Sequence, residues 1–149
     1  MEERGYSNVK PILTPRFIPS CTDALMEKLS LLRDRYGLPV QSHLSENMGE
    51  VEFVKELSPS SAFYGDAYDR FGLFGGEGKN GCIMAHCVLS GEDEISLIKK
   101  NGVYVAHCPE SNANLKSGIA PLRRYLDEGI NVGLGSDIAG GTTESIFDA

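Results

Sequence analysis

Clusters of basic residues are missing from this 149-residue sequence. It holds 14 lysines and arginines against 21 aspartates and glutamates, which gives a formal net charge of −7. No window gathers the positive side chains together. Proteins that bind nucleic acid through its phosphates need such clusters, so the sequence predicts that nucleic acid is not a partner.

Long apolar runs are missing as well. No stretch approaches the roughly 18 residues that a membrane-spanning helix requires. The first residues, Met1 to Gly5, lack the basic-then-apolar order of a secretory signal. We therefore expect no membrane partner and a cytoplasmic location.

Cysteine pairs with the C-x-x-C spacing are also absent. The four cysteines are unevenly spaced, and Cys87 and Cys108 each follow a histidine. Because neighbouring residues of a strand point to opposite faces, one metal site would rarely use both members of such a His-Cys pair. We expect neither a disulfide framework nor a cysteine zinc site, and we interpret the thiols as small core residues.

The composition that remains is typical of one folded domain, with 41% hydrophobic and 23% charged residues. Short apolar runs alternate along it with amphipathic stretches. The runs predict five strands, at Val9–Leu13, Leu38–Ser42, Cys82–Ala85, Val103–Ala106 and Val132–Gly135. Each run is followed by a side chain that can carry chemistry, in order Arg16, His43, His86, His107 and Asp137.

Helical spacing of apolar residues marks the stretches between these runs. The predicted helices are Thr22–Tyr36, Glu46–Leu57, Ser90–Asn101 and Pro121–Asp127, the third opened by a pattern like a capping box. The glycine-rich residues 71–81 predict a flexible loop after a short helical segment. We interpret residues 107–112 as a strand end that runs into a polar loop.

Strands that alternate with helices predict an α/β fold with a parallel sheet. An open doubly wound sheet gathers its chemistry at one crevice, whereas a TIM (β/α) barrel places functional side chains at the ends of many strands. Reactive groups after five runs favour the barrel. Because a whole barrel takes roughly 250 residues and both ends of the chain look cut, we expect residues 1–149 to be an incomplete barrel domain from a longer protein.

All three histidines fall at predicted strand ends, and Asp137 falls at a fourth. Imidazole nitrogens and a carboxylate suit zinc or ferrous iron, so the pattern favours one shared site. Taken alone, Asp137 also fits a helix cap or a turn. The role of His107 stays open.

Glu46 follows His43 by three residues. A metal-bound water needs a neighbouring acid/base to pass its proton to a leaving group, which would give Glu46 that task. The alternative is a first-turn acid that complements the helix dipole, with Ser45 as the N-cap. The sequence leaves these two interpretations evenly matched.

Five motifs carry a resemblance to a known family. They are Thr14–Phe17, Gln41–Glu46, Met84–Cys87, Ala106–Asn112 and Gly133–Asp137. In order and spacing they resemble the amidohydrolase superfamily, and most closely its guanine deaminases, from about Lys10 to the C-terminus. The resemblance implies roughly strands 4 to 8 of the metal-dependent hydrolase barrel.

This resemblance implies zinc-dependent hydrolysis of guanine to xanthine and ammonia, in purine catabolism, by a longer and homo-oligomeric protein. It implies metal ligands at His43 and Asp137. It implies a catalytic set of Glu46, His86 and Asp137, with Glu46 as the proton shuttle. The family's first barrel strand brings a His-x-His pair to the metal, and this sequence has no such pair.

Substrate binding falls, in this resemblance, to Arg16, Phe17 and His86. An arginine donates hydrogen bonds to a carbonyl or ring acceptor of guanine that the edge of adenine does not offer in the same place. Two alternatives stay open. One is a deaminase or chlorohydrolase of another aminated heterocycle in the same superfamily, and the other is a truncated fragment without catalysis.

Overall fold

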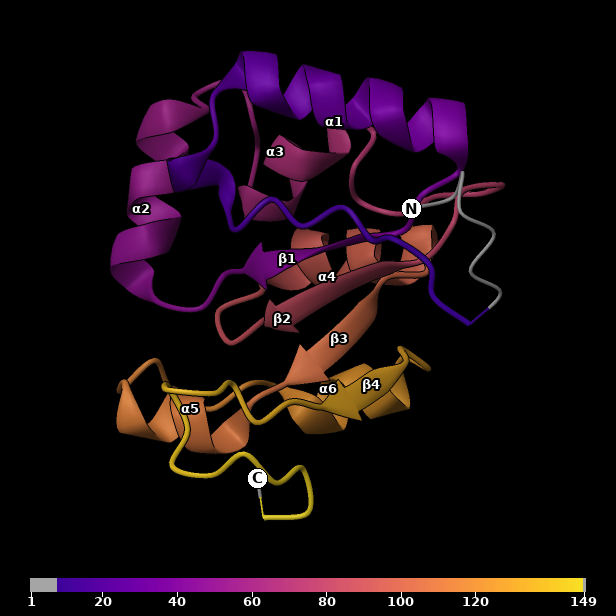
Figure 1. Cartoon of the computed structure of the whole chain (residues 1–149). Coiled ribbons are helices and arrows are strands. Elements are labelled where there is room, and N and C mark those ends of the chain that lie inside the picture. The colour runs from indigo at the N-terminus through magenta and orange to yellow at the C-terminus, as the bar shows by residue number, and fades with distance from the viewer. Residues whose placement is uncertain (1–7, 149) are drawn as a thin grey trace.

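A four-stranded parallel sheet forms the centre of the computed structural model, which describes residues 8–148. The strands are β1 (Val40–Leu44), β2 (Cys82–His86), β3 (Tyr104–His107) and β4 (Val132–Leu134), hydrogen-bonded in that order. All three pairs run parallel (Figure 1). An order that follows the chain without reversal is that of a barrel wall and not of a doubly wound sheet. The predicted α/β fold with a partial barrel is confirmed.

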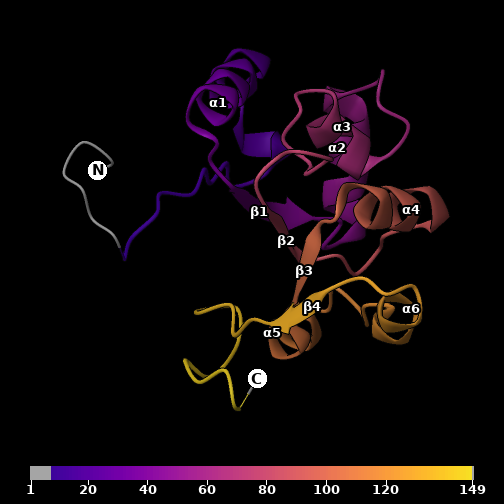
Figure 2. The ribbon, with the colours of Figure 1, turned by 90° about the vertical axis from the view of Figure 1, so that its right-hand side faces the viewer.

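Helices connect the strands. They are α1 (Asp23–Tyr36), α2 (Met48–Leu57), α3 (Tyr64–Asp69), α4 (Glu92–Asn101), α5 (Pro109–Asn114) and α6 (Leu122–Asp127). Figure 2 shows α2, α3, α4 and α6 on one side of the sheet. No helix within residues 8–148 is long and apolar enough to cross a lipid bilayer.

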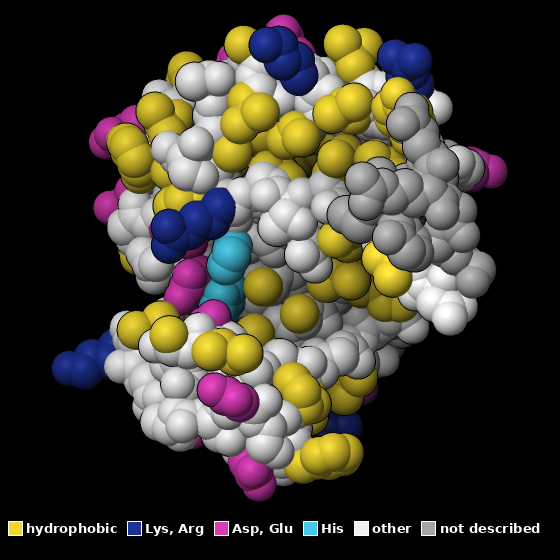
Figure 3. Space-filling model, in the orientation of Figure 1, with side chains coloured by type: hydrophobic (Ala, Val, Ile, Leu, Met, Phe, Trp, Pro, Cys, Tyr) yellow, Lys and Arg dark blue, Asp and Glu magenta, His cyan; other side chains and the backbone are white. Residues whose placement is uncertain are grey.

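The two faces of the sheet differ in burial. Alternate strand residues such as Leu44, Met84 and Val105 are buried under the helices. On the other face, Ile83 and Tyr104 are 39% and 48% exposed. Because parallel sheets are normally covered on both faces, this bare face is what a partial barrel presents. It forms a hollow lined by hydrophobic side chains (Figure 3).

The first predicted strand, Val9–Leu13, is not a strand in the structure. This segment meets β1 at a single parallel bridge, between Leu13 and Val40. The next backbone donors in this register would be residues 11 and 15. Both are prolines, which have no N–H to donate, so the ladder cannot extend in either direction.

Two predicted helix starts need correction. Helix α2 begins at Met48, and its N-cap is Asn47, whose side chain accepts a hydrogen bond from Glu50 N–H at 3.0 Å. Ser45 is therefore not the N-cap. The N-cap of α4 is Gly91, with no hydrogen bond from a side chain, so the predicted capping box at Ser90 is wrong.

Residues 109–114 form a short helix, α5, where we predicted a polar loop. Pro109 stands in the first turn, where its fixed backbone angle suits a helix and its missing N–H costs nothing. The predicted loop at residues 71–81 is present, and its backbone is held from α1. The buried Arg33 side chain donates hydrogen bonds to the carbonyl oxygens of Gly72, Gly75 and Asn80.

Candidate active site

Two histidines meet at the carboxyl end of the sheet. His43 is the next-to-last residue of β1, and His86 is the final residue of β2. Their rings stack with centroids 5.4 Å apart and planes inclined by 20°. Figure 3 shows histidine side chains beside acidic ones at the edge of the hollow. His107 ends β3 at the same end of the sheet.

The ring of His43 is held by a backbone carbonyl. Its Nδ1 lies 2.6 Å from Arg16 O, and its backbone N–H donates to the same oxygen at 3.3 Å. A carbonyl oxygen only accepts, so Nδ1 carries a proton, and in the neutral tautomer Nε2 then holds the lone pair that a metal needs. Histidines that bind metals are commonly oriented in this way by a partner on the other ring nitrogen.

Glu46 lies between the strand and the helix that follows it. One carboxylate oxygen is 3.7 Å from His86 Nε2, and the other accepts a hydrogen bond from Ser117 Oγ at 3.4 Å. Glu46 stands before the N-cap Asn47 and so outside α2. The interpretation of Glu46 as a first-turn acid behind an N-cap at Ser45 does not fit this geometry.

His86 has a second partner that sequence reasoning missed. Its Nδ1 lies 2.9 Å from Asn112 Oδ1, and both residues are only 1% exposed. Asn112 belongs to α5, the helix that we had predicted as a loop. A six-residue helix is too short to show apolar periodicity, so only the proline at its start could have signalled it.

Asp137 follows β4 and is held by residues from two other segments. Its carboxylate accepts a short hydrogen bond from Ser111 Oγ. Gly140 packs against the same carboxylate, where a Cβ would collide with it. Among residues 8–148, no hydrogen bond or ion pair joins Asp137 to His43 or His86, although all three lie at the same end of the sheet.

Left-handed backbone recurs at the strand ends. Ser45 after β1, His86 and Cys87 at the end of β2, and Asp137 after β4 have φ angles of 46°, 71°, 49° and 47°. Residues with a Cβ avoid this region, and such strain concentrates at functional sites. It is a second mark of a site at this edge of the sheet.

Arg16 and Phe17 lie beside the β1 end of the site. The Arg16 guanidinium is 5.2 Å from the centroid of the Phe17 ring, a cation–π distance. The Arg16 side chain is exposed, and among residues 8–148 no carboxylate forms an ion pair with it. Its guanidinium is therefore available to a ligand.

Burial shifts the pKa values of one further histidine and two cysteines near the strand ends. It lowers the pKa of His107, whose Nδ1 is buried and finds no hydrogen-bond partner in the part of the chain that is described. It raises the pKa of the Cys108 thiol to about 11 and that of Cys87 well above its usual range. These thiols stay protonated near neutral pH and are unsuited to act as nucleophiles or ligands.

The donor types at this edge fit zinc, but their number falls short. His43 Nε2 and a carboxylate are suitable ligands, and a structural or catalytic zinc takes at least three from the protein. No group of three or more His, Cys, Asp or Glu side chains in residues 8–148 is arranged to hold a metal ion. The described residues alone do not complete a zinc site.

Comparisons with known proteins agree with this geometry. The sequence pattern described as "Amidohydrolase family" matches residues 2–148. A probable guanine deaminase of Schizosaccharomyces pombe is 45% identical over 141 residues, which cover 95% of this chain and 26% of that protein.

Solved structures give the same result. A guanine deaminase from C. acetobutylicum with guanine bound in its active site is 55% identical, with a TM-score of 0.90 over 95% of this chain and 33% of that one. An adenosine deaminase from Xanthomonas campestris with bound zinc is 28% identical, with a TM-score of 0.82 over 94% of this chain and 30% of that one. The chain thus spans about a third of the length of these structures. It belongs to the amidohydrolase family.

Proposed function

We propose that this chain is part of a zinc-dependent enzyme that hydrolyses guanine to xanthine and ammonia, in purine catabolism. The observation that carries the proposal is the Glu46–His86 pair, 3.7 Å apart beside a second imidazole. General acid/base catalysis needs such groups within reach of one substrate. The likeness to guanine deaminases at 45% and 55% identity supports guanine as the substrate.

The reaction replaces the amine at C2 of guanine by oxygen. Zinc, when bound, supplies the Lewis acidity that makes water a nucleophile near neutral pH. Asp137 accepts one proton of the attacking water, and Glu46 gives a proton to the ring nitrogen beside C2. Glu46 then takes the proton of the new hydroxyl on C2 and passes it to the amine, the C2–N bond breaks, and ammonia leaves as the carbonyl of xanthine forms. The proton on Asp137 returns to Glu46, which restores both carboxyl groups. His86 hydrogen-bonds the tetrahedral centre.

Zinc is held, in this proposal, by His43 Nε2 and Asp137 together with ligands from outside the 149 residues. The free lone pair of His43 supports this role, because Arg16 O fixes the proton on Nδ1 at 2.6 Å. Ser111 and Gly140 would hold the Asp137 carboxylate in place. A zinc-bound adenosine deaminase among the structural relatives supports the choice of metal.

Guanine is bound, in this proposal, by Arg16, Phe17 and His86. The Arg16 guanidinium has no carboxylate partner among residues 8–148, so it is free to donate to acceptors on the purine. The half-buried ring of Phe17 would pack against the base. The homo-oligomeric state and the cytoplasmic location stay predictions.

A product assay tests the proposal. The whole protein that carries this chain is incubated with guanine, adenosine and an aminotriazine, and xanthine and ammonia are quantified. We expect equal amounts of both products from guanine and a higher kcat/KM for guanine than for the other compounds. Preference for another heterocycle would favour a different deaminase or a chlorohydrolase, and no turnover of any would favour a fragment without catalysis.

A further inference from the structure

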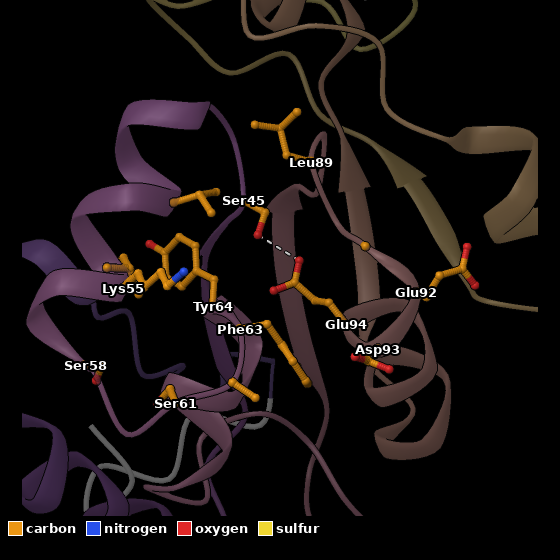
Figure 4. A pocket seen from close by; sticks show the side chains of 14 residues that line it. Ser45, Lys55, Ser58, Ser61, Phe63, Tyr64, Leu89, Glu92, Asp93 and Glu94 are labelled. Atoms are coloured by element: carbon orange, nitrogen blue, oxygen red, sulfur yellow. Dashed lines mark hydrogen bonds between the residues drawn. The ribbon is translucent and has the colours of Figure 1, made fainter.

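Glu94 is a buried acid outside the set of groups discussed so far. It lies in the first turn of α4 and is only 3% exposed. One of its carboxylate oxygens accepts a hydrogen bond from Ser45 Oγ at 2.7 Å, and the other accepts one from Gly65 N–H at 2.7 Å. Figure 4 shows the bond to Ser45 at the wall of a cavity of about 330 Å³. Glu94 thus ties the end of β1 to α3.

Glu50 makes the matching connection from α2. It is 8% exposed. One oxygen accepts a hydrogen bond from Tyr64 Oη at 2.6 Å, and the other accepts one from the backbone N–H of Glu46 at 3.3 Å. Glu50 therefore also joins the residues after β1 to α3.

The two carboxylates bridge the same two dipeptides. On one side stand Ser45 and Glu46, and on the other stand Tyr64 and Gly65. We call Glu50 and Glu94 the carboxylate clamp. No lysine or arginine in residues 8–148 forms an ion pair with either, so directional hydrogen bonds hold the clamp.

We propose that the carboxylate clamp positions Glu46 against His86, with Glu94 as one of its two positioning residues. This inference rests on the proposed function, in which Glu46 is the proton shuttle. Glu94 and Glu50 do not touch the substrate. They act through Ser45 and the Glu46 backbone.

The backbone at Ser45 shows why a clamp is needed. Its φ angle of 46° lies in the left-handed region, which serine adopts only where its surroundings hold it. Glu46 follows this residue and precedes the N-cap of α2, so no helical hydrogen bond fixes it. Leu89 N–H donates a hydrogen bond to Ser45 O at 2.9 Å, and Ser117 Oγ donates one to the Glu46 carboxylate. The clamp adds hydrogen bonds to the Ser45 hydroxyl and to the Glu46 N–H.

The other end of the clamp is rigid. A Cβ at Gly65 would lie 3.0 Å from Phe74 Cζ and 3.4 Å from Glu94 Cγ, so α3 is packed closely against α4. Tyr64 and Phe74 are 3% and 0% exposed. Because each carboxylate binds both the fixed helix α3 and the strained turn at Ser45 and Glu46, it restrains the turn relative to the helix.

Three variants of the whole protein test this proposal through kcat and KM for guanine. Glu94→Ala removes both bonds, and we expect kcat to fall on the order of 10–100-fold because small displacements of a catalytic group are costly. KM should stay within about twofold. Glu94→Gln should keep most of kcat, since its amide oxygen accepts from Gly65 N–H and its NH₂ donates to a rotated Ser45 hydroxyl. Asp93→Ala, an exposed acid of the same turn, should match the wild type.

A purely structural role is separated by a double-mutant cycle with Glu46→Gln. Positioning has no value once residue 46 cannot carry a proton, so Glu94→Ala should cause no further loss of kcat in that background. An equal loss in both backgrounds, or a wild-type kcat per folded molecule in Glu94→Ala, would overturn the proposal.

Crystal structures of the wild type and Glu94→Ala give a readout that does not depend on the reaction. We expect Glu46 to move away from His86 in the variant. An unmoved Glu46 would overturn the positioning role. A wild type that fails to deaminate guanine would overturn the proposed function and leave this structural comparison decisive for the clamp.

Discussion

Glu46 stands between a left-handed serine and the N-cap of α2, and this placement keeps its carboxylate outside the helix. A residue inside the first turn would spend its charge on the helix dipole. Here the carboxylate instead faces His86 Nε2 at 3.7 Å. The pairing of Glu46 with His86 therefore depends on Glu46 lying before the N-cap of α2 and not within its first turn.

The sequence predicts that Glu46 lies near the start of α2, but it does not show whether Glu46 lies inside the helix or before it. The spacing of His43 and Glu46 indicates that both side chains leave the same strand end. Ser45 and Asn47 are both good N-cap residues, so residue type does not choose between them. The choice follows from contacts between distant segments, such as the bond from Ser45 Oγ to Glu94 in α4.

Arg16 offers the test of substrate choice. Replacing it by alanine should leave acceptors on guanine unpaired and cost about 1–3 kcal/mol in kcat/KM for guanine. Lysine should be a poor substitute because it lacks the planar fork. The measurement is kcat/KM for guanine and for other amino-heterocycles, in the wild type and in Arg16→Ala. A uniform loss across all substrates would show that Arg16 holds the strand end instead.

Glu94 predicts a pH dependence of stability. Burial raises the pKa of its carboxyl above the usual 4.5, with nearby Glu50 as a smaller cause. The folded protein then holds this proton more tightly than the unfolded chain. The protonated Glu94 carboxyl therefore contributes fully to the free energy of unfolding below the usual pKa. This contribution is lost as the pH rises through the raised pKa.

Glu94→Gln does not titrate at this position. We expect its free energy of unfolding, relative to that of the wild type, to increase as the pH rises from about 4 to 7. Urea unfolding at a series of pH values measures this difference, with Asp93→Asn as the control from the same helix turn. A difference that is flat or falls with rising pH would show that burial does not raise this pKa.

Among the elements, the loop at residues 71–81 contacts both α1 and the end of α4. Its backbone bends back on α4 at Gly75, where a Cβ would lie 2.5 Å from Asn101 O, and the φ angle is 76°. Gly78 has a similar φ of 70° but open space around it. A side chain at Gly78 would therefore meet only backbone strain, whereas a side chain at Gly75 would meet backbone strain and a steric collision.

Alanine at each glycine tests this division. Gly78→Ala should cost about 1–2 kcal/mol in the free energy of unfolding, from the left-handed backbone alone. Gly75→Ala should cost about 1–3 kcal/mol more, because the methyl group collides with a carbonyl oxygen. Denaturant unfolding gives both values. Equal losses would mean that the loop moves freely away from Asn101.

Element prediction succeeded where runs were long and failed where a local feature decided the outcome. Helix α1, predicted over Thr22–Tyr36, spans Asp23–Tyr36 with Thr22 as its N-cap, and it ends at Gly37, which has a left-handed φ of 60°. The Val9–Leu13 run has the apolar character of a strand, but prolines at 11 and 15 remove the donors that a ladder needs. An apolar pattern predicts that a segment is buried, but it does not show whether the backbone of that segment can form the hydrogen bonds of a strand.

At the scale of the whole molecule, the sheet is half covered. Its bare face carries Ile83 and Tyr104, and its carboxyl end carries a set of donors that is too small for zinc among residues 8–148. The strand order and the family could be predicted from motif order. The placement of the Asp137 carboxylate could not, because it depends on contacts with Ser111 and Gly140.

Zinc affinity follows from this ligand count. The isolated 149-residue chain should bind zinc far more weakly than a site with three or four protein ligands. Calorimetric titration with zinc is the measurement, and His43→Ala is the matched variant. Tight one-to-one binding that His43→Ala abolishes would show that the chain completes a metal site by itself.

In the proposed function, Glu46 carries protons for the deamination of guanine. The most direct test of this role is kcat for guanine in Glu46→Gln of the whole protein, with zinc content and guanine affinity measured on the same sample. The amide keeps the shape of the carboxylate but cannot carry a proton, so we predict retained zinc and guanine binding with a loss of roughly 10²–10⁴-fold in kcat. A kcat near that of the wild type would contradict the account and leave Glu46 with a structural role only.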